Sequence, residues 1–327
     1  MILGIVSPCY NESAVLPETA RRLTRLLQQL EAEGKVERGS FILFVNDGST
    51  DETWALISRL YRENPYVLGI SLAANSGHQN ALLAGLLTAR GMADAVVSID
   101  ADLQDDVSVI SQMVDAYAEG YEIVYGVRRS RQTDTFFKRS TALGFYRLMR
   151  ALGVRSVYNH ADFRLMGRKA LESLSEFKER NLFLRGIVPL LGYNSTSVYY
   201  DRQERFAGES KYPLRKMLNF AVDGITSFSV KPVRLIFFTG LMLLLLSMAA
   251  FVYVFYALFS GRAVAGWTSI MLSIWFIGSI ILLSIGVIGE YIGKIYMEVK
   301  ERPRYHIDIS LTDRNGKENN LSRKEGA

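Results

Sequence analysis

Two acidic residues in this sequence have the type and spacing needed to bind a hard cation. Asp100 and Asp102 are separated by one small residue, so in an extended segment their side chains leave the same face and can converge on one ion. Such an ion would in turn hold a diphosphate. The residues alone leave an alternative open, because Asp102 or Asp105 would also serve as the N-cap of a helix that begins near Val107.

The element that must position these acids is a short buried strand. Residues 96–99 form an apolar run rich in β-branched residues, which is typical of a strand in a sheet covered on both faces. Three earlier segments have the same character, and each is followed by a polar turn and a helical pattern of apolar residues. The predicted strands cover residues 2–7, 41–45, 66–72, 96–99 and 122–126.

Strands that alternate with helices predict a mostly parallel sheet, and ligands of such sheets bind at the carboxyl ends of the strands. Polar turns at residues 8–12, 46–51 and 75–78 would lie at this edge, beside Asp100. Each turn taken singly is also explained by ordinary turn-forming residues. Three such turns at one edge, together with the acidic pair, favour a binding site.

The three polar segments at the predicted strand ends resemble the donor-site motifs of inverting family 2 glycosyltransferases of GT-A fold. They read Pro-Cys-Tyr-Asn-Glu at residues 8–12, Asn-Asp-Gly-Ser-Thr-Asp at 46–51 and Asp-Ala-Asp-Leu-Gln-Asp at 100–105, in the order and spacing of that family. The resemblance implies an α/β, Rossmann-like GT-A catalytic domain with a mostly parallel sheet. It also implies inversion at the anomeric carbon of the transferred sugar.

The same resemblance implies roles for individual residues. Asp100 and Asp102, with Gln104, would bind Mg²⁺ or Mn²⁺ and through it the diphosphate of a nucleotide-sugar donor, and Asp102 would be essential for catalysis. The expected donor-binding residues are Pro8, Tyr10, Asn11, Glu12, Asp47 and Asp100.

A basic segment follows the last predicted strand. Residues 128–155 contain eight basic residues and one acid, and apolar and aromatic residues interleave with them at helical spacing. This pattern predicts a basic amphipathic helix in a membrane interface. A core-packing helix with a solvated basic face remains the alternative.

Residues 159–164 resemble the acceptor-side motif of the same family, with Asp162 in the position assigned to a general base. A phosphate monoester acceptor is already largely a dianion at neutral pH, so it needs little deprotonation, and Asp162 would orient more than it abstracts. The alternative is a buried carboxylate that pairs with Arg164 or with a backbone amide.

Residues 202–212 contain arginines and a lysine around a flexible glycine, a combination that can wrap an anion. The segment resembles the Arg-x-x-Gly-x-Ser-Lys-Tyr string of polyprenyl-phosphate glycosyltransferases, which include bactoprenol glucosyltransferases and dolichyl-phosphate mannosyltransferases. The Gln-x-x-Arg-Trp string of the family's processive synthases does not occur. The expected acceptor phosphate-binding residues are Arg128, Arg131, Arg139, Arg202, Arg205, Ser210 and Lys211.

Two segments are long and apolar enough to cross a bilayer. Residues 235–261 and 263–289 each contain 27 positions without a charged residue, more than the ~20 that a bilayer core requires. Lys and Arg crowd both outer flanks, whereas Arg262 alone occupies the connecting loop. The catalytic domain and both termini are therefore expected on the cytoplasmic side of the plasma (inner) membrane.

The expected domains are a catalytic domain over residues 1–212, a juxtamembrane segment over 213–234, the two membrane helices, and a cytoplasmic tail over 290–327. The last part of this tail is polar and is expected to be disordered.

Composition excludes several other classes of protein. A formal net charge of +5 is too small to suggest nucleic acid binding, but it suits an anionic membrane surface. The single cysteine, Cys9, excludes an intrachain disulfide, and three scattered histidines give no zinc-ligand spacing. Glycines in the second apolar segment are compatible with a homo-oligomer.

Together these patterns predict a membrane-anchored, metal-dependent transferase. It would move one sugar from a nucleotide-sugar such as UDP-glucose to undecaprenyl phosphate, giving a polyprenyl-phosphate-sugar for modification of envelope glycans. Two alternatives stay open. One is a different lipid acceptor such as a diacylglycerol, whose hydroxyl nucleophile would make Asp162 indispensable, and the other is a catalytically silent membrane adaptor.

Overall fold

A computed structural model describes residues 1–128, 160–180, 183–201, 267–313 and 319–320, with isolated residues between 233 and 242. The chain divides into two compact units. The first contains residues 1–142, 155–212 and 302–327, and the second contains residues 143–154 and 213–301. The first unit carries the sheet and all of the candidate site described below.

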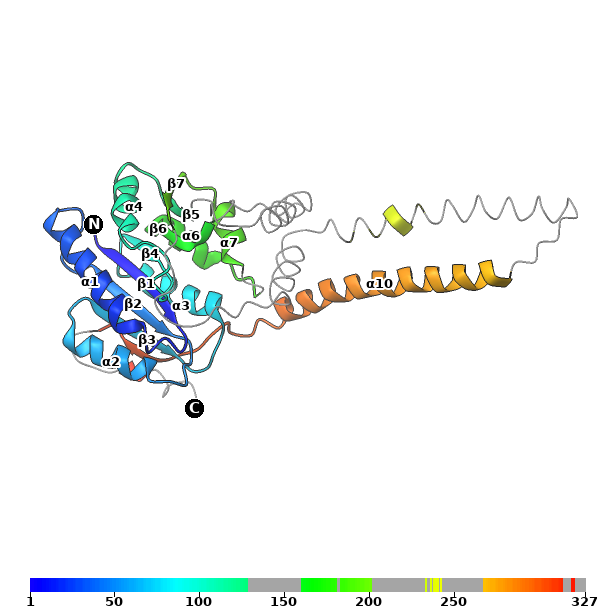
Figure 1. Cartoon of the computed structure of the whole chain (residues 1–327), viewed down its shortest axis with the longest axis horizontal. Coiled ribbons are helices and arrows are strands. Elements are labelled where there is room, and N and C mark those ends of the chain that lie inside the picture. The colour runs from blue at the N-terminus through cyan, green and yellow to red at the C-terminus, as the bar shows by residue number, and fades with distance from the viewer. Residues whose placement is uncertain are drawn as a thin grey trace, which may run out of the picture. The chain divides into compact units, whose positions relative to one another are not determined.

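The first unit is built on a nine-stranded sheet in the order β7-β5-β6-β4-β1-β2-β3-β8-β9 (Figure 1). The strands are β1 (Leu3–Cys9), β2 (Phe41–Asn46), β3 (Val67–Leu72), β4 (Ala95–Ser98), β5 (Ile123–Arg128), β6 (His160–Gly167), β7 (Ser195–Tyr200), β8 (Ile307–Leu311) and β9 (Asn319–Asn320).

The pairing confirms the prediction of a mostly parallel sheet at its centre. β1 pairs in parallel with β2 and β4, β2 with β3, and β5 with β7. The antiparallel strand β6 was not predicted, and it lies between β4 and β5. Its insertion brings residues 160–164 to the edge where β4 ends.

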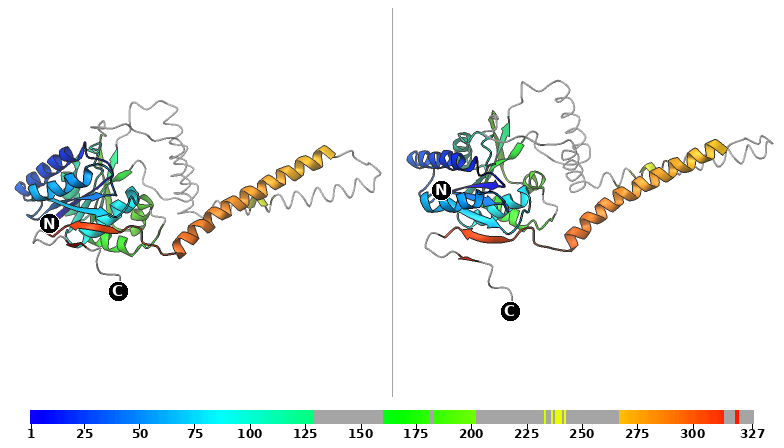
Figure 2. Two further views of the ribbon diagram at one scale, coloured as in Figure 1. Left: turned by 90° about the horizontal axis from the view of Figure 1, so that it is seen from below. Right: turned by 60° about the horizontal axis from the view of Figure 1, so that its bottom comes forward.

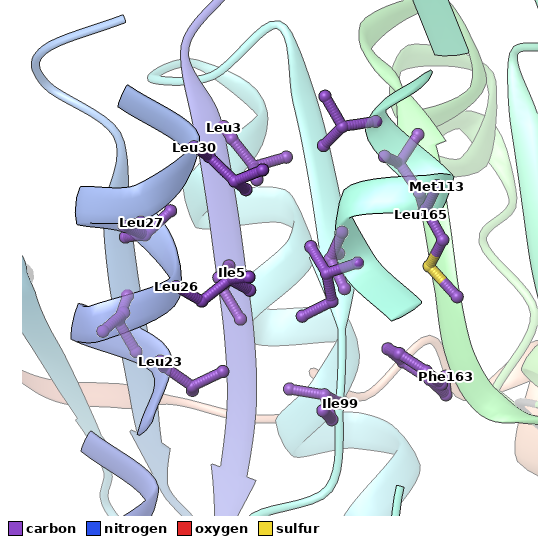
Figure 3. Packing of buried hydrophobic residues seen from close by; sticks show 14 of the residues in the cluster. Leu3, Ile5, Leu23, Leu26, Leu27, Leu30, Ile99, Met113, Phe163 and Leu165 are labelled. Carbon is purple, nitrogen blue, oxygen red and sulfur yellow. The ribbon is translucent and has the colours of Figure 1, made fainter. Parts of the chain in front are cut away.

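Helices cover both faces of the sheet. They are α1 (Leu16–Ala32), α2 (Thr53–Glu63), α3 (His78–Arg90), α4 (Val109–Ala118), α6 (Arg168–Glu176) and α7 (Leu184–Ile187), followed by the 3-10 helix η1 (Val188–Leu191). The leucines of α1 pack on β1, beside residues of α4 and β6 (Figure 3). On the opposite face α3 approaches so closely that a Cβ on Gly85 would lie 2.4 Å from Val6.

The tail rejoins the catalytic sheet. β8 pairs antiparallel with β3, and the backbone N–H of Ala73 donates to the carbonyl of His306 at 3.0 Å (Figure 2). The expectation of disorder is therefore wrong for residues 307–311. The pattern Ile-Asp-Ile-Ser-Leu alternates apolar and polar residues, so the signal for a strand was present.

The second unit contains the helix α10 (Trp267–Val299), which extends ten residues beyond the predicted end at Gly289. Residues 276–299 are long and apolar enough to cross a membrane, and this is the single helix of that kind within the described ranges. The other predicted span, residues 235–261, lies almost wholly outside the described residues.

The turn after β2 depends on a glycine. Gly48 has φ +64°, and a Cβ at this position would lie 2.5 Å from the backbone nitrogen of Asn75. The 46–51 turn therefore packs directly against the backbone that precedes α3. Only a residue without a side chain fits both the conformation and the contact.

We expect Gly48→Ala to lower the free energy of unfolding by about 2–4 kcal/mol, because left-handed strain and a backbone collision add together. Gly34→Ala is the matched control, since Gly34 has φ +70° and a Cβ at this position would meet no other atom within 4 Å. It should cost only about 1–2 kcal/mol. Thermal unfolding of the full chain in detergent measures both changes, and equal losses would show that the contact with Asn75 has no effect.

Candidate active site

The first two polar turns are locked together by hydrogen bonds. The backbone N–H of Asn11 donates to Ser49 Oγ at 3.0 Å, and Asn11 Oδ1 accepts from the backbone N–H of Thr50 at 2.9 Å. Asp51 accepts from the backbone N–H groups of Ser13 and Thr53. These contacts hold the exposed ring of Tyr10 at the carboxyl end of β1.

Asp47 links the second turn to the third. Its side chain is buried, and its two oxygens accept from the backbone N–H groups of Ser76 at 2.7 Å and Gly77 at 3.1 Å. Burial raises the pKa of the Asp47 carboxyl, and the two amides oppose this rise. Asp47, one of the predicted donor-binding residues, thus also fixes the start of α3.

Asp100 lies among other carboxylates just beyond β4. Its side chain is 35% exposed, and partial burial raises the pKa of Asp100 to about 6, with the carboxylates of Asp105, Asp162 and Asp102 adding to the rise. His78 opposes it, with its Nε2 atom 3.5 Å from Asp100 Oδ1. Crowding of this kind favours a cation at the site.

The loop after Asp100 is anchored by a buried cluster. Asp105 Oδ1 accepts from Arg128 Nη2 at 3.0 Å and from the Tyr200 hydroxyl at 2.5 Å, and Arg128 Nε donates to the same hydroxyl at 3.2 Å. Burial and the nearby Asp105 raise the pKa of Tyr200. Asp105 Oδ2 is buried without a hydrogen-bond partner among the described residues. The cluster ties the acidic loop to the ends of β5 and β7.

Asp162 is held by two arginines. Arg164, which is fully buried, donates from Nη2 to Asp162 Oδ1 at 2.8 Å. Arg185 of α7 donates from Nε to Oδ1 at 3.3 Å and from Nη2 to Oδ2 at 3.1 Å. Burial alone would raise the pKa of Asp162, but His78 and both guanidinium groups hold this pKa well below its ordinary value.

The register of β6 explains why Asp162 lies near Asp100. Ser98 of β4 lies opposite Arg164, so Asp162, two residues earlier on an antiparallel strand, lies beside the residues that follow Ser98. The Ser98 hydroxyl donates to the carbonyl oxygens of Asp162 and Arg164. His78 then spans the gap, because its Nε2 atom is 3.6 Å from Asp162 Oδ2.

The donor set of the acidic loop suits Mg²⁺ or Mn²⁺. Asp100 and Asp102 carry carboxylate oxygens, which are hard donors, at the end of one strand, and the backbone N–H of Gln104 donates to Asp102 Oδ1 at 3.2 Å, which fixes the loop. Within the described ranges no group of three or more His, Cys, Asp or Glu side chains is arranged to hold an ion. An ion bound here would take further ligands from phosphate oxygens and water, as Mg²⁺ commonly does.

The structure brings together the predicted residues of the donor side and Asp162. Arg128 lies at the same edge, in the cluster with Asp105 and Tyr200. The other predicted acceptor phosphate-binding residues lie outside the described residues and stay predictions: Arg131, Arg139, Arg202, Arg205, Ser210 and Lys211.

Sequence reasoning did not assign roles to His78, Arg164, Arg185 or Tyr200. His78 was part of the third predicted turn, and Arg164 appeared only as a partner of Asp162. Arg185 lies in a segment without a strong periodic pattern. Its place at the site follows from the packing of α7 against β6. Tyr200 ends a strand that was not predicted.

Comparison with known proteins agrees with this geometry. The family model described as "Glycosyl transferase family 2" matches residues 4–175. The chain belongs to this family. Its sheet is that of a GT-A-like α/β fold. A second family model, described as "GtrB C-terminal hairpin", matches residues 231–295.

Relatives of this glycosyltransferase share most of its length. A Bacillus subtilis protein named "Uncharacterized glycosyltransferase YkoT" is 57% identical over 310 residues, which cover 95% of this chain and 92% of the relative. The "Bactoprenol glucosyl transferase" of Shigella phage SfII is 40% identical over 315 residues, which cover 95% and 98% of the two chains. The protein of the same name from Shigella phage SfV is 40% identical over 312 residues, which cover 94% and 98%.

We expect Arg164→Met to lower the free energy of unfolding by about 3 kcal/mol or more, because it removes the buried partner of a buried carboxylate. Arg168→Met is the matched control. Arg168 pairs with Asp94 at 2.9 Å at the amino end of β4, on the far side of the sheet from the candidate site, and both side chains are exposed. Loss of this ion pair should cost about 1 kcal/mol or less. Thermal unfolding compares the two variants. A small loss for Arg164→Met would contradict the assignment of Arg164 as the charge partner of Asp162.

Proposed function

We propose that this glycosyltransferase moves a single sugar from a UDP-sugar to the phosphate of a polyprenyl lipid at the cytoplasmic membrane face, with inversion at the anomeric carbon. One observation supports the proposal most strongly. The acidic loop after β4 and the cluster of Asp162 with its arginines lie at the same end of the sheet. His78 Nε2 lies 3.5 Å from Asp100 in the loop and 3.6 Å from Asp162 in the cluster. Donor and acceptor can therefore meet there.

The donor would bind along the first three turns. Tyr10 and Glu12 would contact the uracil or ribose, and Asp47 would present its outer lone pairs to the base edge. The hydrogen bonds among these turns support this role, because they fix the turns before the donor arrives.

Asp100 and Asp102, with Gln104, would hold the divalent cation. When bound, the cation would neutralise the negative charge that develops on the leaving nucleoside diphosphate. The cluster of Asp105, Arg128 and Tyr200 would keep the acidic loop in place for this task.

On the acceptor side, Asp162 would serve as an orienting group rather than as a base that abstracts a proton. A carboxylate whose pKa is held low by guanidinium groups is a weak base. A phosphate monoester needs no strong base, whereas the hydroxyl of a diacylglycerol would need one. The charge environment of Asp162 therefore favours the phosphate acceptor over the hydroxyl acceptor.

For the membrane we propose two spans, close to residues 235–261 and 263–289. β8 follows α10 in the chain and pairs with β3, so the segments on either side of the membrane region belong to one sheet. Two parts of one sheet lie on one side of a membrane, and the chain between them must cross an even number of times. The charge-free segments and the hairpin family match at residues 231–295 support two crossings.

We expect Asp102→Asn to leave the protein folded and to lower sugar transfer by at least about a hundredfold, because it removes a charge that binds the cation. Membranes containing the full chain are incubated with labelled UDP-sugars and undecaprenyl phosphate, and label is counted in an acid-labile lipid. Asp106→Asn is the matched control, since the Asp106 side chain accepts hydrogen bonds from the backbone N–H and the hydroxyl of Ser108, just before α4 begins. It should retain most of the activity.

Two outcomes of this assay would count against the proposal. Wild-type transfer that persists in excess EDTA would remove the cation from the mechanism. Absence of a labelled phosphate-linked product with every nucleotide-sugar would leave the diacylglycerol acceptor, if label enters a neutral lipid, or the silent adaptor, if no lipid is labelled.

The topology makes a separate prediction. A reporter fused after Ala327 should be cytoplasmic, and a reporter inserted at Gly266 should be on the far side, because the flanks of the membrane region carry the basic residues. The accessibility of a single reactive residue at each of these two positions to a membrane-impermeant reagent gives the same information. A cytoplasmic Gly266 reporter would contradict two crossings.

A further inference from the structure

Among the described residues, two arginines of the site contact the same carboxylate. Asp105 is paired with Arg128, and Asp162 is paired with the fully buried Arg164. Asp100 and Asp102 are the residues assigned to the cation. Arg185 is then a second guanidinium on a carboxylate that already has its partner, so the group of Asp162, Arg164 and Arg185 has a net charge of +1.

Arg185 is fixed in place from several elements. The backbone N–H of Leu184 donates to Gln79 Oε1 of α3 at 2.9 Å, and Arg164 Nη1 donates to the Leu184 carbonyl at 3.5 Å. Both oxygens of Asp162 accept from the guanidinium of Arg185. The side chain nevertheless remains 36% exposed. One side of the guanidinium is thus held by Asp162 while the group still faces solvent.

The carboxylate that holds Arg185 lies next to the proposed donor site. His78 Nε2 is 3.5 Å from Asp100 Oδ1 and 3.6 Å from Asp162 Oδ2, so one imidazole separates the predicted cation ligand from the partner of Arg185. The acceptor must bring its attacking oxygen to a sugar whose diphosphate is held at Asp100. An anion that attacks this sugar would pass into the field of Arg185.

We propose that Arg185 binds the phosphate monoester of the acceptor, and that Asp162 is a positioning residue that orients the Arg185 guanidinium. This inference rests on the proposed function and adds to it a specific phosphate-binding residue outside the predicted set. A planar guanidinium suits a phosphate dianion, because it donates parallel hydrogen bonds and keeps its charge.

The reaction balances without a catalytic base. An oxygen of the acceptor phosphate attacks the anomeric carbon and forms the new carbon–oxygen bond. The bond from the anomeric carbon to the diphosphate oxygen breaks, and its electron pair leaves with the nucleoside diphosphate. No proton has to move, so the ionised Asp162 is free to serve Arg185.

The competing interpretation is a purely structural ion pair. In that case Arg185 contributes to stability and has no preference for a phosphate over an alcohol. A test must therefore measure recognition of the phosphate group itself, separately from folding and from donor binding.

The test uses the full chain with three substitutions: Arg185→Gln, Arg185→Lys and the control Arg168→Gln, which removes an arginine from the ion pair at the amino end of β4. Three quantities are measured for each protein. They are kcat/KM for undecaprenyl phosphate, UDP affinity with Mn²⁺ by calorimetry, and the ratio of inhibition by farnesyl phosphate to inhibition by farnesol.

For Arg185→Gln we expect kcat/KM for undecaprenyl phosphate to fall about tenfold to a hundredfold, as for the loss of a hydrogen bond to a charged group. The preference for farnesyl phosphate over farnesol should shrink by a similar factor, while UDP affinity stays within about twofold. Arg185→Lys should recover part of the loss, because it keeps the charge but not the planar fork. Arg168→Gln should match the wild type in all three measurements.

A further measurement needs no substitution. Farnesyl phosphate should protect Arg185 of the wild-type chain from phenylglyoxal, as read by mass spectrometry, and farnesol should not. This experiment decides the question even if Arg185→Gln fails to fold.

The opposite results are equally distinct. If wild-type protein does not glycosylate undecaprenyl phosphate, the proposed function fails. If it does, but Arg185→Gln keeps the phosphate preference, or phenylglyoxal modifies Arg185 equally with and without farnesyl phosphate, the assignment of Arg185 fails alone. A loss of UDP affinity equal to the loss of kcat/KM would place Arg185 on the donor instead.

Discussion

The buried ion pair between Asp162 and Arg164 is the interaction on which the rest of the site depends. Burying a carboxylate or a guanidinium alone is costly, and the two are tolerated inside the domain because they satisfy one another at 2.8 Å. The pair also sits on β6, the antiparallel strand between β4 and β5. Asp162 is thereby held next to the acidic loop, where it contacts Arg185 and His78, so one internal charge pair connects the proposed donor side to the proposed acceptor side.

Much of this arrangement was predictable from local patterns. The four parallel strands and the turns after them were found because β-branched runs and polar turn residues carry their signal within a few positions. The acidic loop and the Asp47 turn were singled out for the same reason, whereas Asp162 was predicted from its resemblance to the acceptor-side motif of the family. The site lies at the predicted strand ends because topology, rather than any single residue, decides where ligands bind in such sheets.

The strands and site residues that were not predicted from the sequence depend on contacts between segments far apart in the chain. β6 contains Arg164 at its centre. A charged residue in the middle of a segment argues against a buried strand unless the residue that pairs with the charge is known. Arg185 and Tyr200 acquire their roles only from pairing with Asp162 and Asp105, which lie 23 and 95 residues away in the sequence. β8 was predicted to be part of a polar tail because it is only five residues long and follows a predicted membrane segment, yet it pairs with β3 in the sheet. That pairing links both ends of the proposed membrane region to one domain, which supports the proposal of an even number of crossings.

We propose that the carboxyl ends of the strands bind the nucleotide and the acceptor phosphate side by side. The most direct measurement is an experimental structure of the full chain with UDP, Mn²⁺ and farnesyl phosphate, in which anomalous scattering locates the metal. We expect Mn²⁺ at Asp100 and Asp102 and the farnesyl phosphate group at Arg185, on the β6 side of His78. A farnesyl phosphate group bound away from Asp162 and Arg185, or Mn²⁺ bound away from Asp100, would contradict this proposal.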